Sequence, residues 1–445
     1  DNFKDYITPL LYYKRISDVY DEETEEALIS SGGDKEYASL PEQHRFVIPD
    51  GCHWQEVRER TENLGAAIVG AMRQIEIANP DTLYGVLSMF SSQKWTNKAI
   101  LNDSKIRDLI EHLSKRKLGN KDYPADLMGD AYEILLKKFA DDSKAQAGEF
   151  YTPRSVVRLL VHILDPQPGE TVYDPACGSG GMLIEAIRYM HDDSLCCGSI
   201  FGQEKNVVNA AIAKMNLFLH GASDFNVMQG DTLRDPKILQ GGNIAKFDCV
   251  IANPPFSLEN WGATEWSSDK YKRNIYGTPS DSCGDYAWIQ HMICSMSSGK
   301  GRMAVVMPQG ILFRGNQEAE IRKQLVESDL IEAVVTLGDK LFYGTGLSPC
   351  FLIIRRMKQA HHSGRILMID GSKILTQKRA QNILEENDID RLYSLYQNYS
   401  DEEDYSRIVT LQEIRDKEYN LSPNRYVVYH KEEIRPYAEV LAEFK

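Results

Sequence analysis

Between residues 146 and 375, short apolar runs alternate with segments of helical periodicity, and this alternation most constrains the fold of the chain. Strands that alternate with helices favour a mostly parallel sheet covered by helices on both faces. Ligands of such sheets bind beyond the carboxyl ends of the strands, so we expect the informative residues directly after strands. The expected strands are Glu170–Tyr173, Ser199–Gln203, Phe225–Gln229, Phe247–Ala252, Met303–Met307, Ile331–Thr336 and Cys350–Arg355, and the expected helices include Met182–Met190 and Val207–Leu219.

The regions on either side of this segment lack the alternation and are predicted to be helical. Before residue 146, apolar residues at helical spacing predict helices over Tyr6–Tyr20, Leu64–Ile77 and Asp126–Phe139. After about residue 375 the sequence again reads as helical and charged. We therefore expect a helical N-terminal domain over 1–145, an α/β domain over 146–375, and a helical C-terminal tail over 376–445 that serves subunit contacts.

The composition limits the classes of function. The formal net charge of −14 opposes tight binding of nucleic acid by this chain alone, because phosphate contacts dominate non-specific affinity. No apolar run approaches the roughly 18 residues of a membrane span, so no membrane association is expected. The eight cysteines include no CxxC pair, which argues against a zinc ribbon, and we expect no metal site. Reduced cysteines of a cytoplasmic protein are the simplest interpretation.

The segment TVYDPACGSGGML at Thr171–Leu183 has the pattern of a ligand-binding loop. An acid closes the strand at Asp174, and Gly178, Gly180 and Gly181 allow positive φ angles and a close approach of backbone to a ligand. The acid suits a cation such as the α-ammonium group of S-adenosylmethionine. A phosphate-binding loop would need GxxxxGK[ST] or GxGxxG spacing, and a preceding acid would repel phosphate. A tight strand-to-helix turn without a ligand is the remaining alternative.

Two further acids follow later strands. Glu204 closes one strand, and a carboxylate at that position can accept both ribose hydroxyls, as in dinucleotide-binding sheets. Asp231 follows the next strand, where it can accept from an adenine amino group. Either acid alone is more often a helix N-cap or a surface charge.

The run FDCVIANPPF over Phe247–Phe256 is predicted to carry the chemistry. Two prolines stiffen the exit of a buried strand. The side-chain oxygen of Asn253 and the carbonyl of Pro254 can accept the two hydrogens of an exocyclic amine, and Phe256 can stack on a flipped base. The alternative is a rigid turn with a packing phenylalanine.

Two other features admit a second interpretation. The dipeptide Pro349–Cys350 matches the nucleophile of cytosine C5 methyltransferases, but Cys350 opens an apolar run and is expected to lie buried in a strand. Lys270, Lys272 and Arg273 lie in the long segment 257–285, where they can contact phosphate or simply belong to a solvated loop.

With these motifs in place, nearly the whole chain resembles the modification (methylase) subunits of type I restriction-modification systems. The matching segments are YITPLLYYKRISD, RFVIPDGCHW, DLMGDAYEILLKKFA, GEFYTPRSVVRLL, DPACGSGGML, NPPF, GRMAVVMPQGILF, GTGLSPCFLIIRR and YNLSPNRYV. Their order resembles amino-methyltransferases of the γ arrangement. The resemblance implies an α/β fold with a Rossmann-like S-adenosylmethionine-dependent methyltransferase sheet, and a site-specific DNA adenine-N6 methyltransferase activity.

The resemblance also implies roles for individual residues. The methionine end of the cofactor would be lined by Glu149, Phe150, Tyr151, Thr152, Pro153 and Arg154, with Asp174, Gly178, Ser179, Gly180 and Gly181 beside it. Relatives often carry Gln where this chain has Glu149. Glu204 would hold the ribose and Asp231 the cofactor adenine. The target base would be handled by Asn253, Pro254, Pro255 and Phe256.

The family further implies partners. Its methylase subunits act on double-stranded DNA with a specificity subunit, commonly two methylases per specificity subunit, and with a motor-nuclease subunit for restriction. An acidic methylase is compatible with this arrangement, because the partner reads the DNA. Two alternatives stay open: an NPPF-type methyltransferase that acts on RNA or protein, and a cofactor-binding assembly subunit without chemistry.

Overall fold

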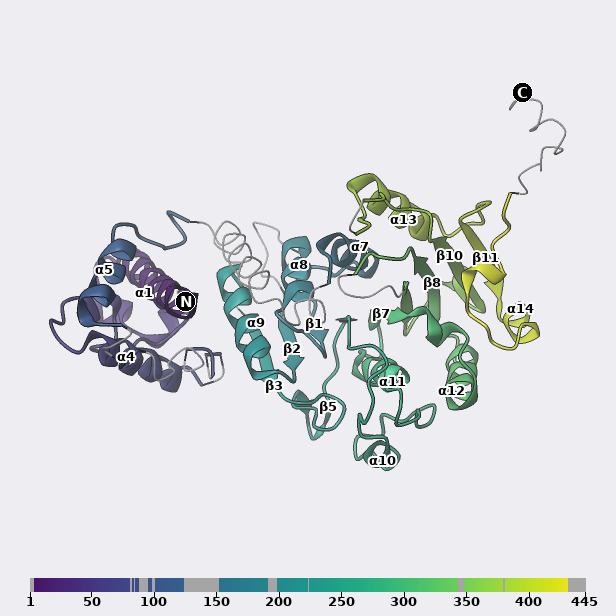
Figure 1. The fold of residues 1–445 in the computed structure, drawn as a ribbon, viewed down its shortest axis with the longest axis horizontal. Helices are drawn as coiled ribbons and strands as arrows, with labels where there is room; N and C mark the ends of the chain where they lie inside the picture. The colour runs from purple at the N-terminus through teal and green to yellow at the C-terminus, as the bar shows by residue number, and fades with distance from the viewer. Residues whose placement is uncertain are drawn as a thin grey trace, which may run out of the picture. The chain divides into compact units, whose positions relative to one another are not determined.

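The computed structural model describes residues 4–80, 82–83, 85–87, 95–97, 101–123, 152–190, 198–222, 224–342, 348–378 and 381–430. These residues form two compact units (Figure 1). The first unit holds the described residues up to Thr152 together with Asp165–Pro255, and the second holds Pro153–Leu164 together with the described residues from Phe256 onward.

The first unit begins with helices. They are α1 (Lys4–Ser30), α2 (Lys35–Ala38), α3 (Trp54–Arg58), α4 (Leu64–Ala78) and α5 (Asp103–Ser114), with a 3-10 turn at Pro41–Gln43. In α1 the side chains of Leu10, Tyr13 and Ile16 recur every three residues and are buried, which is the expected core-facing stripe. The helices predicted near residues 6–20 and 64–77 are therefore confirmed, whereas the one predicted over 126–139 lies outside the described residues. None of the helices in the described part of the chain is long and apolar enough to cross a membrane.

The first unit also contains four parallel strands. Their order is β6 (Cys249–Ala252), β1 (Val172–Asp174), β2 (Ile200–Glu204) and β3 (Phe225–Gln229). The connecting helices α8 (Gly181–Met190) and α9 (Val207–Leu219) pack on these strands. A small hairpin of β4 (Leu239–Gln240) and β5 (Asn243–Ile244) precedes β6. Because the strands are parallel, their carboxyl ends share one edge, as the sequence predicts.

The second unit continues the α/β pattern with longer strands. Its strand order is β11 (Ser406–Thr410), β10 (Arg365–Gly371), β8 (Ile331–Leu337), β9 (Pro349–Arg355) and β7 (Arg302–Pro308). Its helices are α7 (Arg154–Leu164), α10 (Ala263–Trp266), α11 (Asp285–Ser295), α12 (Asn316–Glu327), α13 (Glu386–Asn398) and α14 (Leu411–Asp416), with 3-10 turns at Gln309–Leu312, Ala360–His362 and Pro423–Arg425. Helices α7 and α13 lie on one side of these strands and α11 and α12 on the other (Figure 1).

The strand directions in the second unit are mixed. Strand β9 is antiparallel to both β7 and β8, and β11 is antiparallel to β10, whereas β8 and β10 are parallel. The connection from β8 to β9 spans only residues 338–348, which is too short for the crossover helix that a parallel pair requires.

Every strand predicted from the sequence is present, with bounds that shift by at most two residues, and the α/β fold class is confirmed. Strands β10 and β11 were not predicted. Strand β11 interrupts the region after residue 375 that was expected to be helical, because the edge of β10 offers it a pairing partner.

Candidate active site

Three acidic residues follow neighbouring strands at one edge of the first unit's sheet. Asp174 is the last residue of β1, Glu204 is the last residue of β2, and Asp231 lies two residues after β3. The Asp174 and Glu204 side chains are close enough to interact electrostatically. The hydroxyl of Thr232 donates to the carbonyl of Pro175 over 2.6 Å, which ties the loop after β3 to the loop after β1. No motif in the sequence singles out Thr232.

The glycine-rich loop is folded around these acids. The backbone N–H of Ala176 donates to Asp174 over 2.9 Å, and the N–H of Gly178 donates to Glu204 over 3.0 Å. Gly180 has a φ of +85° and lies against Ala213 of α9; a side chain at this position would meet Ala213 at ordinary contact distance but would strain the backbone. The loop therefore needs glycine here for its conformation.

The loop then leads into α8 at Gly181. The side-chain amide of Asn216 in α9 donates to the carbonyl of Ser179 over 2.8 Å. This bond fixes the middle of the loop from the neighbouring helix.

The electrostatics of this edge favour a cation. The pKa of Asp174 is raised to about 8, chiefly by burial and to a lesser extent by the nearby Glu204 carboxylate. Burial also raises the pKa of Glu204. Among the residues that the structure describes, no basic side chain forms an ion pair with either carboxylate. An ammonium group of a bound ligand would donate to a carboxylate here and favour its ionised form, so these acceptors suit the α-ammonium of S-adenosylmethionine.

Asp231 is engaged in local structure. One carboxylate oxygen accepts from the backbone N–H groups of Leu233 and Arg234, each over 3.2 Å. The other oxygen forms an ion pair with Lys205 over 2.9 Å, and the Lys205 side chain is mostly exposed. Asp231 thus caps the turn after β3, and contact with the cofactor adenine stays a prediction.

Asn253 follows β6 and contacts a segment that is distant in sequence. Its amide nitrogen donates to the hydroxyl of Thr152 over 2.8 Å. Its side-chain oxygen is buried and has no hydrogen-bond partner among the described residues. A buried acceptor without a donor is unfavourable unless a ligand or a water molecule satisfies it. The side chain of Asn253 is therefore arranged to receive a donor.

The rest of this motif is divided between the units. Pro254 is buried and Pro255 is exposed, both in the first unit. Phe256 belongs to the second unit, where its ring lies 6.5 Å from that of Phe342 at an interplanar angle of 55°. Phe342 is an aromatic neighbour that the sequence analysis did not single out.

The segment expected at the methionine end of the cofactor is described only in part. Glu149, Phe150 and Tyr151 lie outside the described residues. Pro153 precedes α7, and Arg154 is the exposed first residue of that helix. Both belong to the second unit, whereas Thr152 belongs to the first.

The basic residues of the segment 257–285 differ in their availability to phosphate. Arg273 is buried, pairs with Asp269 over 2.8 Å, and lies over the ring of Trp266 at 4.3 Å. Arg273 is therefore a structural residue, and neither of the two interpretations left open for it, a phosphate contact or a solvated loop, is correct. Lys270 is exposed and lies over the ring of Tyr271.

Cys350 is fully buried in β9, as expected, and burial raises the pKa of its thiol. A neutral buried thiol is a poor nucleophile, which disfavours the cytosine C5 alternative.

Comparisons with known proteins decide the family. The sequence profile described as N-6 DNA Methylase matches residues 123–434, and that of the HsdM N-terminal domain matches residues 1–113. This chain belongs to the N-6 DNA methylase family. It is an adenine-specific DNA methyltransferase whose cofactor is S-adenosylmethionine, as the sequence predicted.

Individual relatives agree with this assignment. The methylase subunit of the type I restriction enzyme MjaVII of Methanocaldococcus jannaschii is 35% identical, over 98% of this chain and 76% of that protein. The HindI methylase subunit of Haemophilus influenzae is 31% identical, over 78% of this chain and 76% of that protein. A type I restriction-modification methyltransferase subunit from Streptococcus thermophilus has a similar structure, with a TM-score of 0.76, 26% identity, and coverage of 96% and 95% of the two chains.

Proposed function

We propose that this methylase acts as the modification subunit of a type I restriction-modification complex and methylates the N6 amine of an adenine that is flipped out of duplex DNA. The observation that carries the proposal is the Asn253 side chain, whose nitrogen is held by Thr152 while its buried oxygen has no partner among the described residues. An amide fixed in this way presents an acceptor rather than a donor, which is what an amine substrate requires.

The edge of the first unit's sheet is the proposed cofactor site. Asp174 would receive the α-ammonium group, the loop from Gly178 to Gly181 would pack against the methionine part, and Glu204 would accept from the ribose hydroxyls. The pKa of Asp174 is raised to about 8 by burial, and an adjacent cation would lower it again. When bound, S-adenosylmethionine supplies a methyl group activated by its sulfonium charge.

The proposed chemistry relies on positioning. The exocyclic amine of adenine is a weak nucleophile, because its lone pair is delocalised into the ring. Hydrogen bonds to the Asn253 oxygen and to the Pro254 carbonyl would draw the nitrogen toward tetrahedral geometry and localise that lone pair. Phe256 would stack on the flipped base. Placing the two reactants in line then accounts for much of the rate enhancement, with no strong general base.

The partners follow from the family. Type I methylase subunits act together with specificity and restriction subunits and bind DNA. We propose two copies of this chain per specificity subunit, with the helices before residue 146 and the region after residue 375 as the docking candidates. The net charge of −14 supports this division, because an acidic chain needs a partner to supply phosphate and base contacts.

The experiment is a transfer assay with isotopically labelled cofactor and the complex of this chain with its cognate specificity subunit. Duplex DNA, RNA and protein are offered in parallel, and the methylated product is identified by mass spectrometry. N6-methyladenine in duplex DNA alone supports the proposal. Label in RNA or protein instead would favour a methyltransferase that acts on RNA or protein. Cofactor binding without any transfer would favour a cofactor-binding assembly subunit without chemistry.

A further inference from the structure

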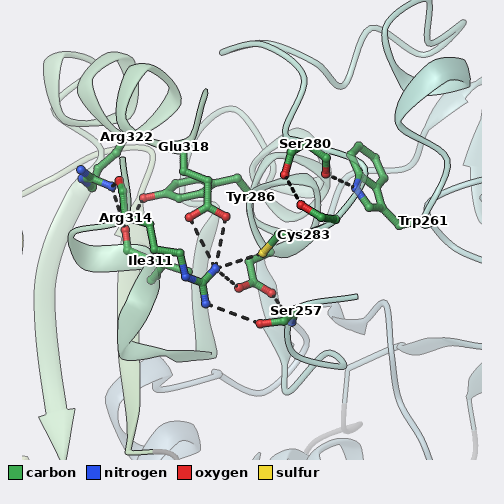
Figure 2. A network of polar contacts seen from close by, with 11 residues as sticks. Ser257, Trp261, Ser280, Cys283, Tyr286, Ile311, Arg314, Glu318 and Arg322 are labelled. Atoms are coloured by element: carbon green, nitrogen blue, oxygen red, sulfur yellow. Dashed lines mark hydrogen bonds and ion pairs between the residues drawn. The ribbon is translucent and has the colours of Figure 1, made fainter. Parts of the chain in front are cut away.

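A cluster of polar side chains in the second unit surrounds the residue that directly follows NPPF (Figure 2). The backbone N–H of Ser257 donates to one carboxylate oxygen of Asp285 over 2.7 Å. The other oxygen of Asp285 pairs with the guanidinium of Arg314 over 2.8 Å. The Asp285 side chain is completely buried and that of Arg314 is 31% exposed, so the ion pair is partly shielded from solvent and from screening by salt.

The Arg314 guanidinium has further partners. Its Nη1 atom lies 3.2 Å from the carboxylate of Glu318 and 3.0 Å from the sulfur of Cys283. The ligand-type atoms of Cys283, Asp285 and Glu318 lie within 4.8 Å of one another, which is a spacing that suits a metal ion. The guanidinium donates to all three side chains and so already takes the place of a cation among them; Figure 2 shows it between Cys283 and Glu318. Without it, two buried carboxylates would face each other unneutralised.

A second set of bonds fixes the segment that carries Arg314. The hydroxyl of Tyr286 in α11 donates to the carbonyl of Ile311 over 2.8 Å. Arg322 of α12 donates to the carbonyl of Arg314 over 2.8 Å and to that of Ile311 over 3.2 Å. The chain between β7 and α12 is thereby tied to both helices, so that Arg314 is a stable partner for Asp285.

The Asp285 carboxylate is not used as a helix cap. Asp285 is the first residue of α11, and the N-cap position is Gly284, which makes no side-chain cap. Both carboxylate oxygens are instead directed to groups outside the helix. Ser257 has a φ of +51°, a left-handed conformation that is uncommon for residues other than glycine. Such a bend persists only when its surroundings hold it.

We infer that Asp285 and Arg314 are positioning residues for the NPPF motif: they hold the left-handed turn at Ser257 and thereby set the direction of Phe256 toward the target base. The inference rests on the proposed role of the motif. Neither residue is assigned a contact with base or cofactor. Asp285 acts through the backbone N–H of Ser257, and Arg314 acts through Asp285 and through the Ser257 hydroxyl, to which it donates over 3.5 Å. Their effect should therefore fall on the rate of transfer and not on cofactor binding.

The test compares Asp285 with a carboxylate of matched environment. The side chain of Asp269 is also buried. It accepts a backbone N–H over 2.8 Å and pairs with an arginine over 2.8 Å, but both partners belong to Arg273 and not to Ser257. Asp285→Asn, Asp285→Ala and Asp269→Asn are prepared in the complex with the specificity subunit. The kcat of methyl transfer, the KM for DNA and the Kd for cofactor are measured, with thermal unfolding as the control for folding.

Asp285→Ala should lower kcat about a hundredfold, because loss of the anchor misplaces a group that must be held precisely for reaction. Asp285→Asn still accepts from Ser257 and should lose only about tenfold. The Kd for cofactor and the KM for DNA should stay within about twofold of wild type, and Asp269→Asn should keep its kcat within a similar range.

Two results would overturn the inference. One is a kcat for Asp285→Ala no lower than that of Asp269→Asn. The other is a loss of kcat accompanied by an equal loss of cofactor affinity, which would indicate a general structural role. If the alanine variant does not fold, Asp285→Asn and Arg314→Lys carry the test, and both should be slower than wild type with unchanged cofactor binding. A wild-type complex that methylates no adenine would instead contradict the proposed function.

Discussion

Binding of the cofactor should release a proton from the first unit. Asp174 is buried at the end of β1, and its pKa is raised to about 8, chiefly by burial and further by the Glu204 carboxylate. Because its pKa is about 8, the Asp174 carboxyl group is mostly protonated at neutral pH in the absence of a ligand. An ammonium group placed beside it favours the ionised form, so that binding of the cofactor expels the proton.

The size of the effect follows from the pKa. At pH 7, a group with a pKa of about 8 is about 90% protonated, so that binding should release about 0.9 proton per site. Release should approach about one proton at pH 6 and fall to about half a proton at pH 8. An exposed aspartate would behave differently. It is already ionised at pH 6, so it has no proton to release anywhere in this pH range.

The assay is isothermal titration calorimetry in buffers that differ in ionisation enthalpy, because the slope of the apparent binding enthalpy against that quantity gives the number of protons released. Asp174→Asn is the control. It should lose most of the release and bind the cofactor about tenfold to a hundredfold more weakly, because a charged hydrogen bond is lost. A binding enthalpy independent of buffer at pH 7, or a release that the asparagine variant retains, would refute the assignment of Asp174 as the partner of the ammonium.

Three further predictions concern orientation, stability and DNA binding. Thr152→Val should lower kcat about tenfold by freeing the Asn253 amide, whereas Thr152→Ser should stay near wild type; equal rates for the two variants in single-turnover assays would contradict this role. Without ligand, the folded state holds the Asp174 proton up to pH 8 while the unfolded state loses it near pH 4, so the free energy of unfolding should fall across that window. Asp174→Asn should therefore raise the Tm at pH 9 in calorimetry, because it removes the cost of ionising a buried carboxyl group, and a lower Tm would contradict this reasoning. The isolated chain should bind DNA weakly and without site preference in a gel-shift assay, because its net charge is −14, and selective methylation by the chain alone would contradict the proposed division of labour.

Much of the fold was predictable because its elements carry local signals. The bounds of β3 and α9 match the predicted Phe225–Gln229 and Val207–Leu219, since each is a mostly apolar segment that a glycine or a polar residue follows. The direction of β9 was not predictable from its composition, because it depends on the length of the connection from β8. Strand β11 carries little apolar character of its own and owes its conformation to pairing with β10.

The candidate site likewise contains residues that local sequence predicts and contacts that it does not. Asp174 and Glu204 were predicted from their positions after strands, and the structure brings them together with the glycine-rich loop. The contact of Thr152 with Asn253 joins segments 101 residues apart, so no local sequence pattern predicts it. The burial of Arg273 likewise depends on Asp269 and on packing, so its charge alone was a poor guide to function.

The most direct test of the central claim is the Asn253→Ala variant in the complex with the specificity subunit. Cofactor affinity and transfer of labelled methyl groups to adenine in duplex DNA are measured on the same preparation. The account predicts a Kd for cofactor within about twofold of wild type and a kcat lower by on the order of a hundredfold or more, since the buried oxygen acts on the target amine alone. Near-normal turnover by this variant would show that the amine is activated without Asn253, and the proposed mechanism would be wrong.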